Sequence, residues 1–327
     1  MMPADKDSAR TITFGGFTGK LEDASCPTCV NPSSPELVFK KSNNVGIWKC
    51  PNCEIMYASP RFSEESLLLI YENETFLDDS FYHDWSYEKW KKENTQRSYI
   101  PQTLKIQLVR RFLSQRDRIL DVGCGTGLFC LEATKQGLNV EGIDPSATLI
   151  EFGRKLFGIP LHHGQLEEFE PDHRYKGIVL WAVLEHVYNL KDLIKRCGDL
   201  LEEEGYLFID VPNHEGASNR FKTFLSQKGL KGSDFKHFGF PWHIYSFNKK
   251  SLSCLMKACG FEPVRFEFWS HLLKDGANGL FARMAITLIQ RFELSDYITL
   301  VAQKRTRTWN EKASSPLPFE DQRIAAH

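Results

Sequence analysis

The sequence predicts an α/β fold: an open, Rossmann-like sheet of mainly parallel strands, preceded by a small module with two cysteine pairs. Three observations lead to this prediction. An apolar segment at 118–122 runs into alternating glycines, as a strand does before a tight turn and a helix. A second apolar segment, 139–143, ends in Asp144. Two Cys-x-x-Cys pairs lie upstream of both segments.

The composition is that of a globular chain. Its 327 residues are 42% hydrophobic, enough for one large α/β domain with an appendage. The net charge of −1 gives no reason to expect general affinity for nucleic acid or membranes. No apolar run approaches the roughly 18 residues of a membrane helix. The polar segment 1–20 lacks the apolar core of a signal peptide, so we expect a disordered N-terminus and a cytoplasmic protein.

The cysteine pairs have the spacing of a structural metal site. Two Cys-x-x-Cys turns, with twenty residues between them, supply four thiolates for a tetrahedral zinc ion; they are Cys26, Cys29, Cys50 and Cys53. Short segments at 36–40 and 46–49 then form strands of a zinc ribbon over 21–60, too poor in apolar residues to fold without metal. Free thiols or a redox pair are the alternative. We expect this ribbon to be a lid or docking element with a core of its own.

Residues 61–115 are expected to form a helical, aromatic linker and lid. A helix-like run covers 64–70, and aromatic side chains crowd 78–99. Several of them recur at helical spacing, which indicates packing against the ribbon. An aromatic wall over a ligand pocket is the alternative.

The glycine turn indicates a ligand site. Asp121 ends the strand, and three alternating glycines follow, namely Gly123, Gly125 and Gly127. Their backbone can approach a ligand closely, and the next helix directs its amide dipoles at the turn. Asp144 suits a ribose diol. Leu128 stands where a dinucleotide fingerprint has its third glycine, and Asp121 favours a ligand with an ammonium or sulfonium group over a pyrophosphate.

This pattern resembles the class I S-adenosylmethionine (SAM) methyltransferases, which have a seven-stranded Rossmann-like sheet. The resemblance covers about 95–305 in ordered blocks, with further blocks at 164–167, 175–181, 184–187 and 200–209. It implies a methyltransferase domain over 116–304, in which Asp121 and the glycines hold the methionine part of SAM and Asp144 holds the ribose. It adds three further cofactor-binding residues, namely Gln165, Leu166 and Trp181. Gln165 departs from the family, which usually has Asp there, but an amide can still pair with adenine.

Glu185 and His186 follow the block at 175–181, which is the fourth strand of the predicted sheet. Their roles have three possible interpretations. In the first, Glu185 is an acid at a helix start and His186 is a packed or capping group. In the second, His186 is a general base, a role that its ordinary pKa near roughly 6.5 suits. The third is a divalent cation site. Ubiquinone-pathway O-methyltransferases and small-RNA 2′-O-methyltransferases carry E-x-x-E-H here and a later histidine, which His243 resembles. Ala182 stands where their first Glu belongs, which weakens a site for a hard cation.

The segment 213–242 is longer than a strand connection needs and alternates cations with phenylalanines. It is either a solvated surface segment or an acceptor lid whose cations meet a phosphate or carboxylate. Beyond it we expect a helix over 249–258 and two antiparallel edge strands at 264–269 and 297–303. An inserted amphipathic helix over 272–289 is a possible dimer face, and 305–327 is expected to be a disordered tail.

The sequence therefore predicts a SAM-dependent methyltransferase with a structural zinc site, acting on a small, polar, hydroxyl-bearing metabolite. The order of ribbon, helix and sheet domain resembles bacterial methyltransferases of polysaccharide, deoxysugar and specialised-metabolite pathways. An RNA methyltransferase and a non-catalytic SAM-fold scaffold are the two rival hypotheses. The net charge opposes the first, and the intact acids and glycines of the SAM pattern oppose the second.

Overall fold

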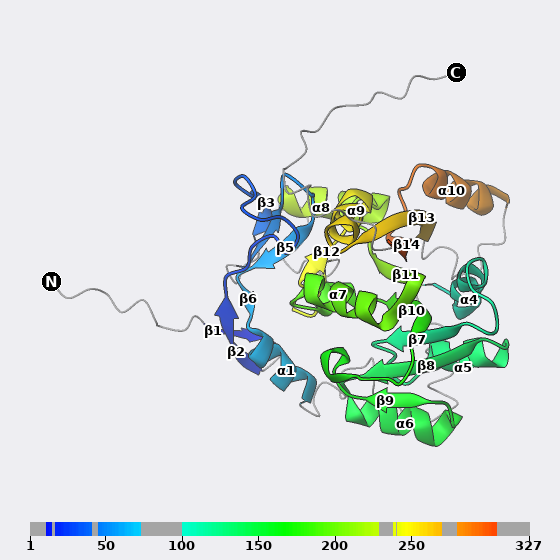
Figure 1. Cartoon of the computed structure of the whole chain (residues 1–327). Helices are drawn as coiled ribbons and strands as arrows, with labels where there is room; N and C mark the ends of the chain where they lie inside the picture. The colour runs from blue at the N-terminus through cyan, green and yellow to red at the C-terminus, as the bar shows by residue number, and fades with distance from the viewer. Residues whose placement is uncertain are drawn as a thin grey trace, which may run out of the picture.

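A seven-stranded sheet forms the centre of the molecule (Figure 1). The computed structural model describes residues 11–14, 17–40, 45–72, 100–228, 238–239, 241–269 and 280–305. In sheet order the strands are β13 (Phe261–Trp269), β14 (Tyr297–Lys304), β11 (Leu201–Pro212), β10 (Tyr175–Trp181), β7 (Arg118–Val122), β8 (Asn139–Asp144) and β9 (Leu161–His163). The strands from β11 to β9 are parallel, and β14 is antiparallel to both of its neighbours. The predicted Rossmann-like sheet and its antiparallel edge pair are confirmed.

Helices cover the sheet, and their ends follow from the local sequence. They are α4 (Gln102–Arg110), α5 (Leu128–Lys135), α6 (Ala147–Phe157), α7 (Leu190–Leu200), α9 (Lys249–Ala258) and α10 (Leu280–Arg291). A further helix, α8 (Ala217–Gln227), contacts β3 (Glu36–Lys40) of the N-terminal module. Ser146 caps α6 by accepting from the Leu149 amide, and Gly158 ends it with a left-handed φ of 63°. A reciprocal capping box of Asn248 and Ser251 begins α9.

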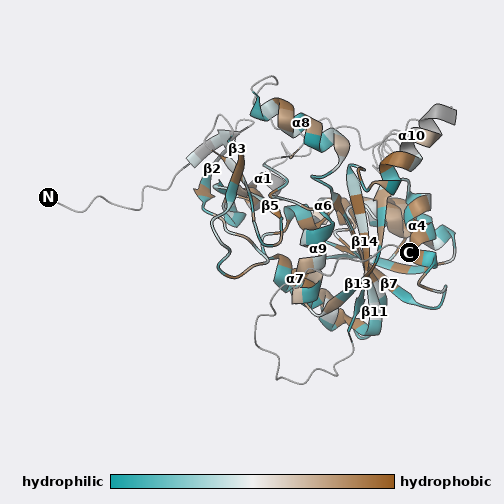
Figure 2. Ribbon diagram, turned by 90° about the horizontal axis from the view of Figure 1, so that it is seen from above, coloured by the Kyte–Doolittle hydropathy of each residue, from teal (hydrophilic) through white to brown (hydrophobic). Residues whose placement is uncertain are grey.

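Helices bury both faces of the sheet. Successive residues of a strand point to opposite faces, so each strand contributes to two hydrophobic cores. On β7, Leu120 and Val122 join the core that includes α7 and α9, whereas Ile119 joins the core that includes α4 and α5. Figure 2 shows the strands running between helices that carry both hydrophobic and hydrophilic residues. An open sheet of this kind binds ligands beyond the carboxyl ends of its strands, at the point where the strand order reverses. Here that point lies beside β7, because β8 and β9 follow on one side of it and β10 and β11 on the other.

The N-terminal module contains two small sheets. One has the order β1 (Thr11–Phe14), β2 (Phe17–Glu22) and β6 (Arg61–Phe62). The expectation of disorder up to residue 20 is therefore wrong for the described residues from 11 on, because β2 pairs with β1 on one side and with β6 on the other.

The second small sheet contains the expected ribbon and one strand from far along the chain. Its order is β12 (Tyr245–Ser246), β5 (Met56–Ser59), β4 (Gly46–Lys49) and β3 (Glu36–Lys40). The ribbon also shares a hydrophobic core with the large sheet, since Ile47, Ile55 and Tyr57 belong to the same buried cluster as Leu120 and Leu180. The expectation of a separate ribbon core is wrong, because the strand that completes the ribbon sheet comes from the sheet domain.

Several expectations fall wholly or partly outside the described residues. The aromatic segment 78–99 and the tail from 306 on lie outside them, as do Lys231, Lys236 and His237 of the expected acceptor lid. Of the helix expected at 272–289, the structure describes α10 from Leu280, with Met284, Leu288 and Phe292 exposed. Dimerisation through this helix stays a prediction. None of the described helices is both long and apolar enough to cross a bilayer.

Candidate active site

The glycine turn after β7 has the backbone that only glycine adopts readily. Gly123, Gly125 and Gly127 have φ values of 70°, 55° and 81°. A Cβ on Gly123 would lie 2.7 Å from a methyl carbon of Val183, and one on Gly127 would lie 2.8 Å from a methyl carbon of Leu161. A Cβ on Gly125 would meet nothing within 4 Å. Gly123 and Gly127 thus permit close packing, and Gly125 borders open space in which a ligand can approach the protein backbone.

Asp144, at the end of β8, fixes this turn. Its Oδ2 accepts a hydrogen bond from the Gly125 amide at 2.8 Å, and its Oδ1 accepts one from the Ser146 amide at 2.9 Å. Each carboxylate oxygen keeps a further lone pair, which a ribose hydroxyl can use. Burial raises the pKa of Asp144, and the two amides oppose that rise.

Asp121 is more deeply buried, with 2% of its surface exposed. The Cys130 thiol donates to its Oδ2 at 3.5 Å. Burial raises the pKa of Asp121 to about 7, against the opposing effect of Lys105. A cationic ligand group beside this carboxylate would favour its ionised form.

The segment expected on the adenine side lies next to Asp144. The Gly164 amide donates to the Asp144 carbonyl at 3.1 Å, and a Cβ on Gly164 would meet nothing within 4 Å. Gln165 is exposed, whereas Leu166 is buried and begins the 3₁₀ helix η1 (Leu166–Glu168). This arrangement is compatible with the predicted adenine contacts, which stay predictions.

Sequence reasoning missed Lys105, a buried cation at the centre of the site. Its Nζ lies 4.9 Å from the centroid of the Trp181 ring, and the side chain comes from α4. Burial lowers the pKa of Lys105, and the negative charges of Asp121, Asp210 and Glu185 raise it. The available signal was a lysine among the apolar positions of a helix, which is equally typical of a side chain that reaches solvent.

The structure brings Glu185, His186 and His243 together. One ligand atom from each lies within 4.8 Å of the other two. The two histidine rings are nearly perpendicular, with centroids 4.8 Å apart. Glu185 and His186 belong to the 3₁₀ helix η2 (Leu184–His186) after β10, and the Ile244 amide ties the His243 segment to the Glu185 carbonyl at 2.8 Å.

The hydrogen bonds of His186 indicate its tautomer. Its Nδ1 lies 3.0 Å from the carbonyl oxygen of Trp242, which can only accept, so Nδ1 carries the proton. Burial lowers the pKa of His186 to about 4, and burial with the neighbouring His186 lowers the pKa of His243 to about 3. Both rings are therefore neutral at pH 7, and Nε2 of His186 can take a proton or bind a cation. A pKa of about 4 makes this ring a weaker base than the ordinary histidine that the sequence pattern predicts.

Glu185 is a buried carboxyl group that lacks a full set of partners. Only 1% of its surface is exposed, and its Oε2 has no hydrogen-bond partner among the described residues. Burial raises the pKa of Glu185 to about 8, and the nearby charge of Asp210 adds to the rise. Ala182, which precedes this segment, has a left-handed φ of 57°, an uncommon backbone for a residue with a Cβ.

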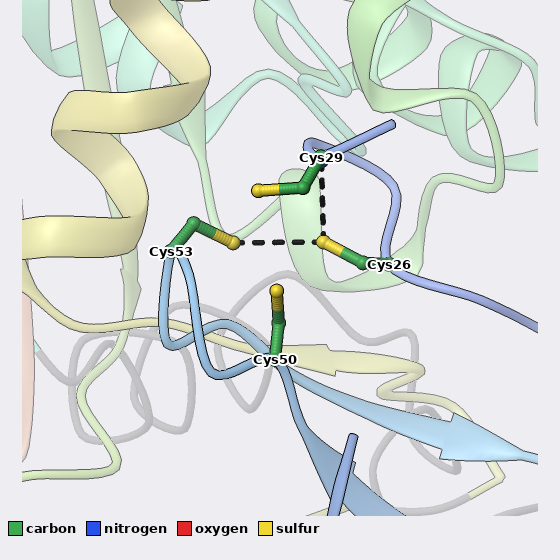
Figure 3. Close-up of side chains that lie close together, drawn as sticks. All are labelled: Cys26, Cys29, Cys50 and Cys53. Atoms are coloured by element: carbon green, nitrogen blue, oxygen red, sulfur yellow. Dashed lines mark hydrogen bonds between the residues drawn. The ribbon is translucent and has the colours of Figure 1, made fainter. Parts of the chain in front are cut away.

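The four cysteine side chains of the ribbon point toward one another (Figure 3). Their sulfur atoms all lie within 4.8 Å, and those of Cys26 and Cys53 are 3.5 Å apart. Zinc–sulfur bonds of about 2.3 Å in a tetrahedron require sulfur atoms about 3.8 Å apart. The Cys29 amide also donates to the Cys26 sulfur at 3.3 Å, as in a knuckle turn. These residues fit a structural zinc ion.

The described part of the expected acceptor lid contacts the ribbon. The Gln227 amide group, at the end of α8, donates to the Val38 carbonyl of β3 at 3.0 Å. Phe221 and Phe224 on the same helix are exposed. Contact with an acceptor stays a prediction.

Comparison with known proteins adds a family. A family model described as a methyltransferase domain matches residues 93–265, which is more than half of the chain. Ubiquinone biosynthesis O-methyltransferases are similar over a shorter stretch. The protein from Rhodopseudomonas palustris strain TIE-1 is 33% identical over 106 residues, and that from Bradyrhizobium diazoefficiens is 30% identical over 106 residues. Each match covers 31% of this chain and 42% of the relative, so the chain spans about two fifths of these relatives.

Solved structures show a more distant likeness. A SAM-dependent methyltransferase from Archaeoglobus fulgidus has a TM-score of 0.47 at 19% identity, covering 66% of this chain and 100% of the other. Magnesium protoporphyrin IX methyltransferase from Synechocystis, solved with S-adenosylhomocysteine, has a TM-score of 0.49 at 14% identity, covering 74% and 100%.

Proposed function

This chain belongs to the methyltransferase-domain family, and from that premise we propose that it transfers the methyl group of SAM to a small, polar, hydroxyl-bearing acceptor such as a sugar. The observation that carries the proposal is the neutral pair His186 and His243, because the rings lie close together and His186 follows Val183, whose methyl carbon lies against Gly123 of the glycine turn. The matched relatives are named O-methyltransferases, which supports an oxygen acceptor. The net charge of −1 argues against RNA.

The cofactor would lie across the carboxyl ends of β7 and β8. SAM supplies an electrophilic methyl group on a sulfonium. Asp121 would hold its ammonium, Asp144 its ribose and Gln165 its adenine, while Leu166 and Trp181 supply apolar surface. Transfer at an already activated carbon depends mainly on alignment and exclusion of water. The burial of Asp121 and Trp181 suits that task.

His186 would act as the general base. As the acceptor oxygen forms its bond to the methyl carbon and the carbon–sulfur bond breaks, Nε2 takes the hydroxyl proton. The hydrogen bond from Nδ1 to Trp242 holds the ring in the tautomer that this requires. His243 would orient the acceptor or share the proton, and protonated Glu185 could donate to the acceptor oxygen.

The test uses labelled SAM and a panel of sugar, nucleotide-sugar and phenolic acceptors. His186→Ala should lower turnover by about 10²–10⁴ while SAM affinity is kept, because general-base catalysis contributes that much. His173→Ala is the matched control, since His173 contacts Glu141 and Asp172 and none of the proposed site residues. Full activity of His186→Ala would contradict the proposed base, and full activity of His243→Ala as well would favour a carbon or amine acceptor.

A divalent cation held by Glu185, His186 and His243 is a second candidate. The three donors converge, and a buried carboxylate oxygen without a partner among the described residues is a common sign of a missing ion. When bound, such a cation polarises an acceptor oxygen and lowers its pKa. The absence of a carboxylate at Ala182 opposes a tight site.

The pH dependence of stability distinguishes this second candidate. Without a cation, the folded pKa of Glu185 is about 8, above its ordinary 4.5, so stability is lost as pH rises through 8. Between pH 6.5 and 8.5 the wild type should lose about 2 kcal/mol of unfolding free energy relative to Glu185→Gln, at 1.36 kcal/mol per pKa unit. If Mg²⁺ or Mn²⁺ binds there, either ion should abolish this difference. A difference that persists in both ions would rule out the cation.

A structural zinc ion in the ribbon completes the proposal. Zinc–thiolate bonds persist where cysteines stay reduced, and the nine cysteines are free thiols in the structure, which supports a cytoplasmic location.

A further inference from the structure

The N-terminal module makes direct contacts with both segments that carry the proposed catalytic histidines. The first contact is a strand pairing. In the ribbon sheet, Tyr245 of β12 pairs with Tyr57 of β5, and the Ala58 amide donates to the Ile244 carbonyl at 3.1 Å. The Ile244 amide donates in the opposite direction, to the Glu185 carbonyl at 2.8 Å. A single residue next to His243, namely Ile244, therefore connects the ribbon with the segment that carries Glu185.

The second contact is made by Arg61 of β6. Its side chain is 11% exposed, and its Nε donates to Glu22 of β2 at 2.9 Å. Its Nη1 donates to the Tyr245 hydroxyl at 2.8 Å, and its guanidinium carbon lies 4.2 Å from the centroid of the Tyr188 ring. A guanidinium stacked on one aromatic ring and hydrogen-bonded to another restrains both side chains.

The two tyrosines are also bonded to each other and to the N-terminal module. The Tyr245 hydroxyl donates to the Tyr188 carbonyl at 3.1 Å, and the Tyr188 hydroxyl donates to the Phe62 carbonyl at 2.7 Å. Both tyrosines are at least nine-tenths buried. A buried network with these partners is rigid, because each broken bond would leave a polar group without water.

The positions of these tyrosines in the sequence carry the inference. Tyr188 follows His186 by two residues, and Tyr245 follows His243 by two residues. The two histidines come from distant parts of the chain, yet each is two residues from a side chain that Arg61 touches. We propose that Arg61 is a positioning residue that sets the distance between the His186 and His243 rings through Tyr188 and Tyr245. The N-terminal module is then part of the catalytic apparatus and not only a docking element.

This inference rests on the proposed function for its catalytic meaning, but its test does not require an acceptor. The two rings are close enough for a nuclear Overhauser effect between their protons in full-length protein with labelled histidines. His186→Gln and His243→Gln assign the signals. Calorimetry with S-adenosylhomocysteine then checks the cofactor site in every variant. The affinity should not change on substitution of Arg61, because no described contact joins Arg61 to Asp121, Asp144 or the glycine turn.

Arg61→Ala should abolish the cross-peak between the rings while the affinity for S-adenosylhomocysteine is unchanged, and Arg61→Lys should restore part of the cross-peak. Tyr245→Phe keeps the buried ring, removes both hydroxyl bonds and should weaken the cross-peak even if Arg61→Ala fails to fold. Arg265→Ala is the control, since Arg265 pairs with Glu267 on exposed surface at 2.6 Å. A cross-peak of full intensity in both Arg61→Ala and Tyr245→Phe would overturn the proposal. Full turnover of His186→Ala would instead overturn the proposed base and leave the positioning role standing.

Discussion

At the scale of single residues, burial sets the charge state of the candidate active site. Asp121, Asp210 and Glu185 are each buried, and burial raises their pKa values to about 7, 6 and 8. Lys105 is the one cation that the described residues place among them. A carboxyl group that is half protonated near pH 7 can respond to a cationic ligand by ionising, so cofactor binding should be linked to proton release.

This linkage gives a prediction for Asp121. The ammonium of S-adenosylhomocysteine should bind only the ionised carboxylate, whose pKa in the free protein is about 7. Affinity should therefore be about tenfold higher at pH 8 than at pH 6, since binding weakens by up to tenfold for each unit below the pKa. Calorimetry at several pH values measures it. Asp121→Asn should bind more weakly and lose most of the pH dependence; an equally steep dependence in that variant would assign the proton to another group.

Some of these residues were predictable from the sequence and others were not. Asp121, Asp144 and the glycines belong to a local strand–turn–helix pattern, so their placement follows from short-range geometry. The environments of Lys105 and Glu185 depend on which elements pack around them. No local pattern shows that a lysine on α4 will face carboxyl groups from β7 and β11.

At the scale of elements, the ribbon and the large sheet are connected more closely than their separation in sequence suggests. The strand bounds of β3, β4, β8 and β10 match the sequence prediction, because each has its own apolar pattern and end signal. The pairing of β12 with β5 was not predictable, since β12 has only two residues and its partner lies far back in the chain. That pairing is the reason that the two regions share one core.

The shared core predicts the effect of losing zinc. Cys26→Ser should lower the zinc content well below one per chain and should also lower the unfolding midpoint of the whole described fold, in one cooperative transition. Elemental analysis and thermal unfolding measure the two effects. Cys259→Ser is the control, since Cys259 is not one of the four cysteines of the proposed zinc site and its thiol contacts the Lys191 carbonyl. Loss of zinc with an unchanged unfolding transition of the sheet domain would show that the two regions are energetically separate.

At the scale of the whole molecule, the strand order places the predicted cofactor residues and the histidines at one edge of the sheet. Asp121 is the penultimate residue of β7, Asp144 ends β8 and Trp181 ends β10, and these three strands are neighbours. His243 reaches the same edge from the segment that continues into the ribbon sheet. The fold therefore brings a proposed cofactor site, a proposed base and a proposed zinc module into contact. We propose that the site at this edge of the sheet holds SAM.

Calorimetric titration of the purified protein with SAM and with NAD tests this claim most directly. SAM should bind in the micromolar range, roughly −8 kcal/mol, and NAD should not bind. Asp144→Ala should weaken SAM binding by about 1.5–3 kcal/mol, the usual contribution of hydrogen bonds to a charged group. Asp172→Ala changes an exposed carboxylate before the start of β10, at the end of that strand away from Trp181, and should leave binding unchanged. Tight binding of NAD without binding of SAM would contradict the account.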